Sequence, residues 1–516
     1  IRGGHTFSII RASFNKIAAH QDKIDFLLAL NQDTFDFHKS RLNDSSVVIY
    51  DSDNVKPGDL SPAIKTCGIP IGSIIKEESA PEIMRNACII GAFCKAAGIK
   101  PEVLESVLKK EISRETDLNL KVAFRGFNAA GEFIKIDPLS QDKLPLITGS
   151  QAMGLGFARG GLQAYISYPM TPSSPLLHFL AEFAEDFSLK VIHPESEIGV
   201  ILMSLGFAYM GKKTAVGTSG GGFCLMTEGL GLAGMAELPI VIVMGQRPGP
   251  STGLPTYTSQ ADLHFVINAG QGEFVRFVVA PADAEEAFYW SAASLNISWK
   301  YQIPSVILVD KTLTEGVFSF DINCVGDIKE DNPSLWGKSP PYKRYLNTDN
   351  GVSALAFPGE KEAVVKANSY EHDEYGITSE DPGLAKMMQE KRLRKEKYLL
   401  EDLKNYNPVK VYGREDSKTA LLCWGSNKGV CVEAARVLGL KVIQLQVLWP
   451  FPAEQFKQSL EGVNRLICVE NNATGQLIKL IKMNGFNVND KILKYDGRPF
   501  PLEELLGLLA QLNLES

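Results

Sequence analysis

No run of apolar residues in this 516-residue chain approaches the roughly 20 that a membrane-spanning helix needs. The strongest apolar run, Leu238 to Met244, has the length of a buried parallel strand instead. Basic residues are not in excess either. The formal net charge is -7, which argues against nucleic acid or an anionic membrane as a partner. With 45% hydrophobic and 22% charged residues, the composition is that of a globular protein with roughly two to four domains.

Paired cysteines are absent as well. The eight cysteines lie scattered, without a CxxC pair, at positions 67, 88, 94, 224, 324, 423, 431 and 468. This is neither a cluster pattern nor a zinc pattern, so we expect no metal site on this chain. Scattered cysteines fit reduced thiols in a cytoplasmic protein. If the protein transfers electrons, its iron–sulfur centre must therefore lie on another chain.

The N-terminal region, residues 1–130, has an α/β pattern. We expect one strand and two helices in it, at 46–51, 80–97 and 101–111. Ile1 is not methionine, and the residues after it resemble the interior of a domain, so we expect that a first strand and turn are missing. A polar connector follows at 128–145.

The central region, residues 146–320, alternates strand and helix patterns, which implies a mostly parallel sheet with right-handed crossovers. Its expected strands are 163–168, 190–193, 213–217, 239–244, 274–277 and 304–309. A third α/β region, residues 416–516, closes the chain. Its expected strands are 419–424, 441–446 and 465–469, and its expected helices are 428–438, 453–460 and 474–484. The predicted fold class is α/β, with three such domains.

Between the second and third regions, the pattern dissolves over residues 321–415. Prolines at positions 333, 340 and 341 indicate a loop. One charged helix is expected at 385–405, and its interleaved positive and negative residues favour a solvated face or a clamp. The prediction is an irregular linker that carries one helix.

The segment from Tyr168 to Ser174 presents Thr171 between two prolines, directly after an expected strand. Each proline ring sets its own φ and biases the residue before it toward extended geometry, so Thr171 is held rigidly. Ser174 and Pro175 suit the N-cap and first position of the next helix. The Thr171 hydroxyl would then lie at the carboxyl end of a strand, where open α/β sheets bind ligands. An ordinary strand-to-helix turn is the alternative.

Glu197 is a second candidate. A short strand leads into a helix that ends at Gly211, and Pro194 suits the first turn of that helix. Glu197 lies near the helix start among apolar residues. The helix dipole also favours acidic residues in a first turn, and Glu195 and Glu197 would both serve it. A structural role is therefore the alternative.

The loop from Gln246 to Thr256 follows the strand 239–244 directly. Three prolines and two glycines make this loop stiff. Arg247 stands at the carboxyl end of a buried strand, where an arginine is costly unless it meets an anion. Its planar fork matches a carboxylate bidentately. Pairing of Arg247 with an internal acid is the alternative.

Gly217 to Gly222 are expected to form a glycine-rich loop after the strand at 213–216. Backbone N–H groups of such loops can cradle phosphate. No Lys-Ser/Thr pair follows, which argues against a P-loop. A lone glycine cluster is a weak signal, but this one lies between Glu197 and Arg247 and gains weight from them.

Together these segments resemble the 2-oxoacid:ferredoxin oxidoreductases, thiamine-diphosphate enzymes that make acyl-CoA from 2-oxoacids. The family patterns Tyr-Pro-x-Thr-Pro, Ser-Glu-x-Gly, Thr-Ser-Gly-Gly and Arg-x-Gly-Pro-Ser-Thr-Gly-x-Pro-Thr are similar to Tyr168–Pro172, Ser196–Gly199, Thr218–Gly221 and Arg247–Thr256. The resemblance covers nearly the whole chain. It is that of an α subunit with a fused N-terminal γ domain, most similar to 2-oxoglutarate enzymes.

The resemblance implies a role for each motif. Glu197 is the carboxyl group beside N1′ of the aminopyrimidine, where it shares a proton with the ring, and Glu195 is the reserve choice. Arg247, Thr256 and Thr171 hold the carboxylate of the 2-oxoacid. Glu197 and Thr171 are thus the expected catalytic residues. The remaining residues expected to bind the cofactor are Tyr168, Pro169, Ser219, Gly220 and Gly221.

The Gly-Asp-Gly motif by which thiamine enzymes bind diphosphate and Mg²⁺ is missing. The resemblance therefore implies a split site: this chain carries the pyrimidine half, and a β subunit carries Mg²⁺, the diphosphate and a 4Fe–4S cluster. The expected reaction is CoA-dependent oxidative decarboxylation of a 2-oxoacid, 2-oxoglutarate first, to acyl-CoA and CO₂ with reduction of ferredoxin. The expected assembly is an αβ heterodimer or an (αβ)₂ heterotetramer.

The resemblance also implies a domain for each region. Residues 1–130 form a γ-type domain, in which Ile1 to Gly4 match a family segment that normally follows a glycine-rich turn. Residues 146–320 form the pyrimidine-type domain, and residues 416–516 a transketolase-C-terminal-like domain used in assembly. The alternatives are a pyruvate or broad-specificity enzyme of the family, a non-oxidative thiamine enzyme, and an assembly subunit with a degenerate site.

Overall fold

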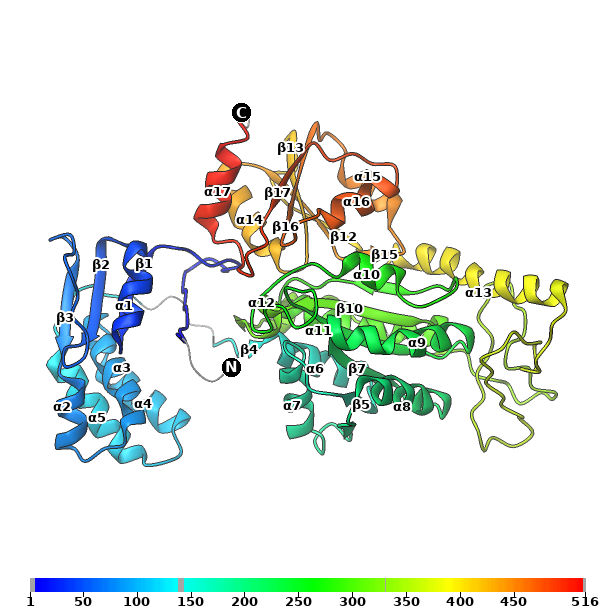
Figure 1. Ribbon diagram of the computed structural model, residues 1–516, viewed down its shortest axis with the longest axis horizontal. Coiled ribbons are helices and arrows are strands. Elements are labelled where there is room, and N and C mark those ends of the chain that lie inside the picture. Colours follow the sequence, from blue (N-terminus) through cyan, green and yellow to red (C-terminus); the bar gives the residue numbers. More distant parts are fainter. Residues whose placement is uncertain (1–4, 138–142, 330, 514–516) are drawn as a thin grey trace. The chain divides into compact units, whose positions relative to one another are not determined.

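The computed structural model describes residues 5–137, 143–329 and 331–513, and the chain forms two compact units, Ile1–Lys143 and Leu144–Ser516 (Figure 1). Helices and mainly parallel strands alternate in both units, which confirms the α/β fold class. The segment Ile1 to Gly4 lies outside the described residues, as does part of the polar connector.

The first unit is built on a three-stranded parallel sheet in the order β1-β2-β3. Its strands are β1 (Ile24–Ala29), β2 (Leu42–Asp51) and β3 (Lys65–Ile69), and its helices are α1 (Gln32–His38), α2 (Ile71–Glu77), α3 (Arg85–Ala96), α4 (Pro101–Glu111) and α5 (Thr116–Ala129). Helix α1 packs on one face of the sheet, and α2 and α3 pack on the other. The helix predicted at 101–111 is confirmed, whereas the one predicted at 80–97 is a short 3₁₀ turn (Glu82–Met84) followed by α3.

The second unit centres on a seven-stranded sheet in the order β15-β9-β10-β8-β7-β5-β6. Its strands are β5 (Ala164–Ser167), β6 (Lys190–Ile192), β7 (Thr214–Ser219), β8 (Ile240–Gln246), β9 (Phe277–Val279), β10 (Pro304–Asp310) and β15 (Val447–Trp449). All neighbours are parallel except β15 and β9. The strand predicted at 274–277 is wrong in its bounds, since β9 runs from Phe277 to Val279. The Arg276 side chain, just before β9, donates hydrogen bonds to the carbonyl oxygens of Val266 and Ala269.

Helices cover both faces of this sheet. Their bounds are α6 (Gly149–Arg159), α7 (Ser174–Glu182), α8 (Glu197–Tyr209), α9 (Gly220–Met235), α10 (Leu263–Asn268), α11 (Ala284–Tyr301) and α12 (Lys311–Thr314). Helices α6, α7 and α11 share one apolar core with the sheet, and α8, α9 and α10 share another. A small antiparallel pair, β4 (Leu146–Thr148) and β11 (Val317–Ser319), borders the sheet region. The carboxyl ends of β5, β7 and β8 therefore open toward the starts of α7, α9 and the loop after β8.

The C-terminal region contains a five-stranded sheet in the order β12-β14-β13-β16-β17. Its elements are β12 (Val409–Gly413), β13 (Thr419–Trp424), β14 (Lys441–Leu445), β16 (Arg465–Glu470), β17 (Asp490–Leu493), α14 (Asn427–Leu438), α15 (Ala453–Ser459), α16 (Gln476–Met483) and α17 (Leu502–Ala510). The predicted strands and helices of this region are confirmed. The elements β12, β17 and α17 were not predicted. Nor was β15, which leaves this region and extends the central sheet, and the two sheets share one hydrophobic core.

The linker differs from its prediction in one respect. Residues 331–381 contain no helix or strand, and α13 (Pro382–Leu403) follows them. One side of α13 is buried rather than solvated, because Lys391 and Lys395 both pair with Glu237, at 2.8 and 2.5 Å. All three side chains are at most 2% exposed. Two of the charged residues of α13 thus form a buried ion cluster with Glu237, and only the opposite side of α13 is a solvated face.

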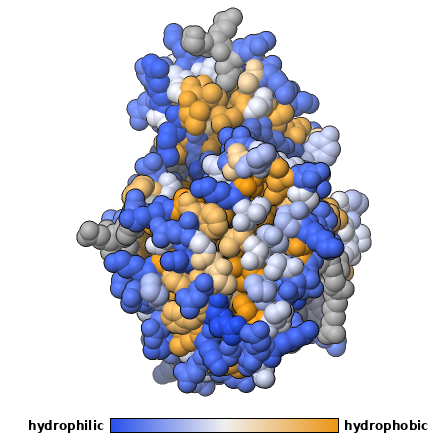
Figure 2. All heavy atoms as spheres, turned by 90° about the vertical axis from the view of Figure 1, so that its left-hand side faces the viewer, coloured by the Kyte–Doolittle hydropathy of each residue, from blue (hydrophilic) through white to orange (hydrophobic). Residues whose placement is uncertain are grey.

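The surface carries a mixture of hydrophilic and apolar side chains, as expected from the composition of the chain (Figure 2). Figure 2 shows hydrophilic side chains over most of one face, with separate apolar areas among them. In the part of the chain that the structure describes, no helix combines the length and apolar character needed to cross a membrane.

Candidate active site

The turn after β5 carries the first motif. Helix α7 begins at Ser174, so Ser173 is its N-cap and Pro175 is its second residue; the predicted N-cap, Ser174, is wrong. Both the hydroxyl and the N–H of Ser173 donate to the carbonyl oxygen of Met170, at 2.7 and 2.8 Å. This closes the turn and leaves Thr171 half-buried at its tip.

Arg247 reaches this turn from the end of β8. Its Nη1 atom donates a hydrogen bond of 2.9 Å to the carbonyl oxygen of Thr171. Within residues 5–137, 143–329 and 331–513 this is the guanidinium's one hydrogen bond, and it has no ion pair within 4 Å. Burial lowers the pKa of Arg247, and the charge of Asp262 opposes that effect. The remaining N–H groups of a charged fork are thus available to an anion.

Glu197 is the first residue of α8 and is only 4% exposed. Its Oε1 atom is buried and has no hydrogen-bond partner among the described residues. A buried carboxyl oxygen without a partner is costly, so a ligand that hydrogen-bonds to it stabilises this arrangement. Glu195, the reserve candidate, is exposed. The geometry therefore favours Glu197.

The glycines lie against Glu197, but they do not form the predicted loop. Thr218 and Ser219 are the last residues of β7, and Gly220 to Gly222 form the first turn of α9. A Cβ atom on Gly222 would lie 2.5 Å from Glu197 Oε1 and would also clash with the Thr218 hydroxyl. Because Gly222 has no side chain, the first turn of α9 can lie this close to Glu197 and to the end of β7. The buried Ser219 hydroxyl has no partner among the described residues either.

The loop from Pro248 to Thr256 is tightly turned. The Leu254 N–H donates to Pro248 O at 2.9 Å, and Gly253 has φ 51°, in the left-handed region. Thr256 is exposed. The C-terminal region supports the loop from behind, where Gly497 packs on it and the Arg498 guanidinium lies 3.9 Å over the Tyr257 ring. The structure therefore brings Arg247 and Thr171 into contact and leaves Thr256 at the surface of the same loop.

Asp262 is an acidic residue at this site that the motifs did not reveal. A Cβ atom on Gly220 would lie 3.4 and 3.5 Å from its two carboxyl oxygens. Burial raises its pKa to about 6, and the charge of Arg247 acts in the opposite direction. Asp262 occupies the N-cap position of α10, where aspartate is common, but its side chain makes no capping hydrogen bond. The sequence therefore held no signal for its position.

Pro169 borders an open cavity beside the turn, and Tyr168 contacts a residue in the wall of that cavity. The ring of Tyr168 meets His193 edge-on, with centroids 5.8 Å apart. Pro169, His178, Lys190 and His193 are among the residues that line the cavity, whose volume is about 520 Å³. Pro169 and His193 are exposed, whereas Tyr168 is half-buried. Of the predicted cofactor-binding residues, Pro169 thus lines this cavity and Tyr168 packs against His193 in its wall. Ser219 to Gly221 lie at the end of β7 and the start of α9.

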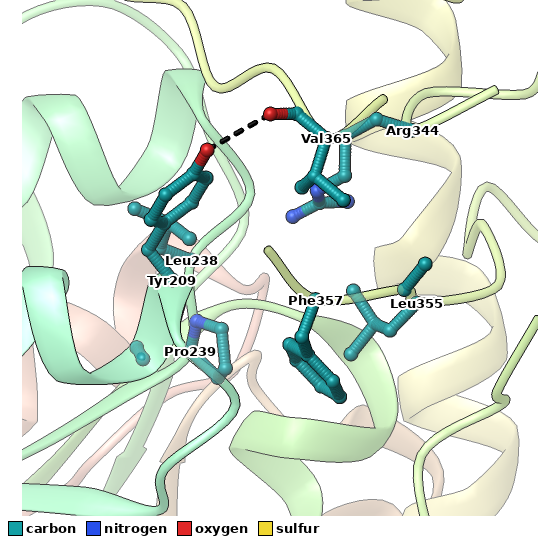
Figure 3. Close-up of a pocket in the computed structure, with 9 residues that line it drawn as sticks. Tyr209, Leu238, Pro239, Arg344, Leu355, Phe357 and Val365 are labelled. Carbon is teal, nitrogen blue, oxygen red and sulfur yellow. Dashed lines mark hydrogen bonds between the residues drawn. The ribbon is translucent and has the colours of Figure 1, made fainter. Parts of the chain in front are cut away.

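A second pocket lies where the linker meets the central sheet region (Figure 3). The Tyr209 hydroxyl donates to Val365 O at 2.8 Å, and Phe357 and Leu355 close the pocket from the linker side (Figure 3). Its volume of about 10 Å³ has room for roughly one water molecule. This pocket is a packing gap and does not compete with the site around Glu197.

Two family models match the chain. Pyruvate ferredoxin/flavodoxin oxidoreductase matches residues 1–129, and the thiamine-diphosphate-binding model of pyruvate flavodoxin/ferredoxin oxidoreductase matches residues 156–390. The 2-oxoacid:ferredoxin oxidoreductase subunit alpha of Saccharolobus solfataricus is 35% identical over 83% of this chain and 71% of its own length. The chain belongs to this family of α subunits. The resemblance predicted from the motifs is therefore confirmed, and the chain is an oxidoreductase subunit with a thiamine-diphosphate-binding domain.

Other members of the family add detail. The 2-oxoglutarate oxidoreductase subunit KorA of Mycobacterium tuberculosis is 29% identical over 83% of this chain and 69% of its own length. The fold resembles that of a 2-oxoglutarate:ferredoxin oxidoreductase from Magnetococcus marinus, solved with 2-oxoglutarate, coenzyme A and succinyl-CoA bound. The TM-score is 0.87 at 28% identity, covering 96% of this chain and 89% of that one.

The residues present fit thiamine diphosphate. A carboxyl oxygen and a hydroxyl, on Glu197 and Ser219, are buried without partners among the described residues. Three glycines leave the start of α9 free of side chains between them. The first N–H groups of a helix have no partner within the helix and are donors to a ligand. The start of α9 therefore offers an acceptor and donors at one place.

Proposed function

We propose that this chain is the α subunit, with γ domain, of a 2-oxoacid:ferredoxin oxidoreductase that acts on 2-oxoglutarate. The reaction converts the 2-oxoacid and CoA to acyl-CoA and CO₂, and it passes two electrons to ferredoxin. The observation that carries the proposal is the buried Glu197 oxygen that has no partner among the described residues. The 2-oxoglutarate enzymes among the similar proteins support this substrate over pyruvate.

Glu197 exchanges a proton with N1′ of the cofactor's aminopyrimidine. Bound thiamine diphosphate supplies the carbon nucleophile and the electron sink for loss of CO₂ from a 2-oxoacid. The pyrimidine side of the site consists of Tyr168, Pro169, Ser219, Gly220 and Gly221. Burial of Glu197 keeps water from competing for that proton, which is what a positioned general acid–base needs.

Arg247 binds the carboxylate of the 2-oxoacid, and Thr171 and Thr256 orient it. Arg247 is already held by its hydrogen bond to Thr171 O, so its fork is oriented before the substrate arrives. Fixing one N–H of the guanidinium lowers the entropy lost on binding. Thr171 lies beside the guanidinium, and Thr256 lies at the end of the same stiff loop.

A β subunit completes the site with Mg²⁺, the diphosphate pocket and a 4Fe–4S cluster. One apolar surface next to Glu197 suits such a partner. Ile198, Leu202, Met203 and Leu225, on α8 and α9, are each 46–49% exposed. Adjacent exposed apolar side chains on neighbouring helices mark interaction sites. The assembly is an αβ heterodimer or an (αβ)₂ heterotetramer that works in the cytoplasm with ferredoxin.

Co-expression with the β subunit tests the function. The complex is assayed for CoA-dependent reduction of a viologen dye with 2-oxoglutarate and, separately, with pyruvate. We expect activity with 2-oxoglutarate, and Glu197→Gln should lower kcat by about 100-fold or more. The matched control is Glu195→Gln, an exposed neighbour that should retain activity. Full activity in Glu197→Gln would overturn the role assigned to Glu197. Release of CO₂ from the 2-oxoacid without reduction of the dye would indicate a non-oxidative enzyme.

A further inference from the structure

Asp262 is an acidic side chain that the proposed mechanism does not use, although it lies within the site. Its carboxyl group makes no hydrogen bond in the described part of the chain, and no ion pair within 4 Å. Glu197 lies against Gly222, whereas Asp262 lies against Gly220. The two carboxyl groups therefore flank the same helical turn of α9.

The segment around Asp262 is held from two sides. The Asp262 N–H donates to Gln246 Oε1, at the end of β8, at 3.2 Å. From the C-terminal region, Gln476 donates to Ala261 O at 2.6 Å and accepts from the His264 N–H at 3.1 Å. The backbone on both sides of Asp262 is therefore fixed, while its carboxyl group is left unbonded. Such an arrangement holds a carboxyl group in place for a partner outside the chain.

The Asp262 N–H is bonded to the side chain of Gln246, the residue directly before Arg247, and the charge of Arg247 lowers the pKa of Asp262 against the effect of burial. The other titratable groups nearby are accounted for. His264, on α10, is hydrogen-bonded through its ring to Gln476 O at 2.8 Å. Glu197 approaches the same turn at Gly222, two residues after the glycine beside Asp262. Asp262 and the carboxylate of a bound 2-oxoacid would thus share a single guanidinium.

We propose that Asp262 takes up one proton when a 2-oxoacid carboxylate binds to Arg247, and releases it after CO₂ has left. This inference rests on the proposed function. Two carboxylates beside one guanidinium in a half-buried site repel each other, so one of them becomes protonated. The bound substrate keeps its charge through its contact with Arg247, and Asp262 accepts the proton from solvent. Loss of CO₂ removes the second carboxylate, and the proton returns to solvent.

The burial of Asp262 places this exchange near neutral pH, because its pKa is already raised to about 6 without substrate. Above that pH the free protein holds Asp262 ionised, and each binding event must supply a proton. The Michaelis constant for the 2-oxoacid should therefore rise with pH, by up to about tenfold per pH unit. Below it, Asp262 is already neutral and the dependence disappears.

The first test measures KM for 2-oxoglutarate from pH 5.5 to 8.5, at roughly half-unit steps, in the complex with the β subunit. We compare wild type with Asp262→Asn, which is nearly isosteric and always neutral. The matched control is Asp349→Asn, an exposed aspartate of the linker. We expect the rise of KM with pH in wild type and in the control, and a flat profile in Asp262→Asn. Parallel profiles in all three proteins would overturn the proposal.

The second test counts protons directly. N-oxalylglycine, an unreactive analogue of 2-oxoglutarate, is titrated into the complex by calorimetry at pH 7.5 in phosphate and in Tris, buffers of different ionisation enthalpy. Uptake of about one proton per bound analogue is expected in wild type and none in Asp262→Asn. If Asp262 serves only as a counter-ion of Arg247, Asp262→Asn would lower KM by the same factor at every pH above about 6, and the wild type would take up no proton on binding. That outcome also overturns the proposal.

Failure of the proposed function gives a different result. A wild-type complex that reduces no dye with any 2-oxoacid refutes the function itself. An active wild-type complex whose KM profile is unchanged in Asp262→Asn refutes only the role of Asp262.

Discussion

The Nη1 atom of Arg247 lies 2.9 Å from the carbonyl oxygen of Thr171, so two motifs 76 residues apart in sequence meet at one point. The contact uses the backbone of Thr171, and among the described residues its hydroxyl and the other guanidinium N–H groups have no hydrogen-bond partner. Each motif ends a strand of the same sheet, and the carboxyl ends of parallel strands share one edge. The pairing of these two residues follows from that common edge.

Arg247→Lys tests the need for a forked cation. A lysine keeps the charge but offers no planar pair of donors, and it cannot hold both Thr171 O and a carboxylate in the same geometry. KM for the 2-oxoacid should rise by about 10–100-fold, with a smaller change in kcat. Steady-state kinetics measures this, and KM for CoA serves as the internal control. A rise in the KM for CoA of the same size would indicate general damage.

Gly222→Ala tests the close approach of α9 to Glu197. The new methyl group would meet Glu197 Oε1 at 2.5 Å, so the carboxyl group must move. We expect kcat to fall by about 100-fold and stability to fall by about 1–3 kcal/mol. The control is Gly507→Ala, an exposed glycine in α17 with open space around it. There the same change should raise stability by about 0.5–1 kcal/mol and leave kcat unchanged.

Glu237→Gln tests the buried ion cluster. Burial alone would raise the pKa of Glu237, but Lys391 and Lys395 outweigh it and hold that pKa below its ordinary value. The substitution leaves two lysines buried without a counter-ion, so the free energy of unfolding should fall by about 3–5 kcal/mol. Urea titration measures it. Asp416→Asn, which breaks the exposed pair with Arg414, should cost less than about 1 kcal/mol.

The same cluster predicts a pH dependence of stability. A carboxyl group whose pKa is lowered by folding stabilises the protein fully above its unfolded pKa of about 4.3. This contribution is lost as the pH falls through the folded value. Acid titration of the wild type followed by thermal unfolding should show that loss, and Glu237→Gln should lack this part of it. Identical acid profiles would contradict the ionised state of Glu237.

Gln476→Glu tests whether the C-terminal region positions the active-site segment. The variant loses the donor to Ala261 O but keeps an acceptor for the His264 N–H. We expect kcat/KM to fall on the order of tenfold, with little change in unfolding temperature. The control is Gln458→Glu, an exposed residue of α15 without a side-chain hydrogen bond in the described part of the chain. Equal kinetics in the two variants would count against a positioning role.

Local signals were enough to predict much of this chain. The alternation of strand and helix patterns predicted the parallel sheets, and the helical pattern at 101–111 predicted α4 with its observed bounds. The errors concern the ends of elements. Helix α7 begins one residue earlier than predicted, with Ser173 as its N-cap, and β9 begins at Phe277 rather than at residue 274. Residue patterns indicate where an element lies, but they do not fix the backbone hydrogen bonds at which it ends.

Motif spacing also could not reveal long-range charge pairs. Lys391 and Glu237 are 154 residues apart, and α13 has the sequence pattern of a helix exposed to water. Asp262 has the sequence context of a helix cap, and its place beside Gly220 depends on hydrogen bonds to Gln476, more than 200 residues later. Neither the pairing of Lys391 with Glu237 nor the position of Asp262 is marked by a periodicity or turn pattern in the nearby sequence. Neither can therefore be predicted from nearby residues.

The amino-acid sequence alone determined the family, the α/β class and the candidates Glu197, Arg247 and Thr171, because short rigid motifs at strand ends encode the chemistry locally. Folding decided which of these groups meet and which stay unpaired. It buried Glu197 without a partner among the described residues, placed Arg247 against Thr171 O, and added Asp262 from a segment that the C-terminal region holds. The burial of a side chain and the identity of its neighbours depend on many contacts between segments that are distant in sequence. These contacts form only when the chain folds.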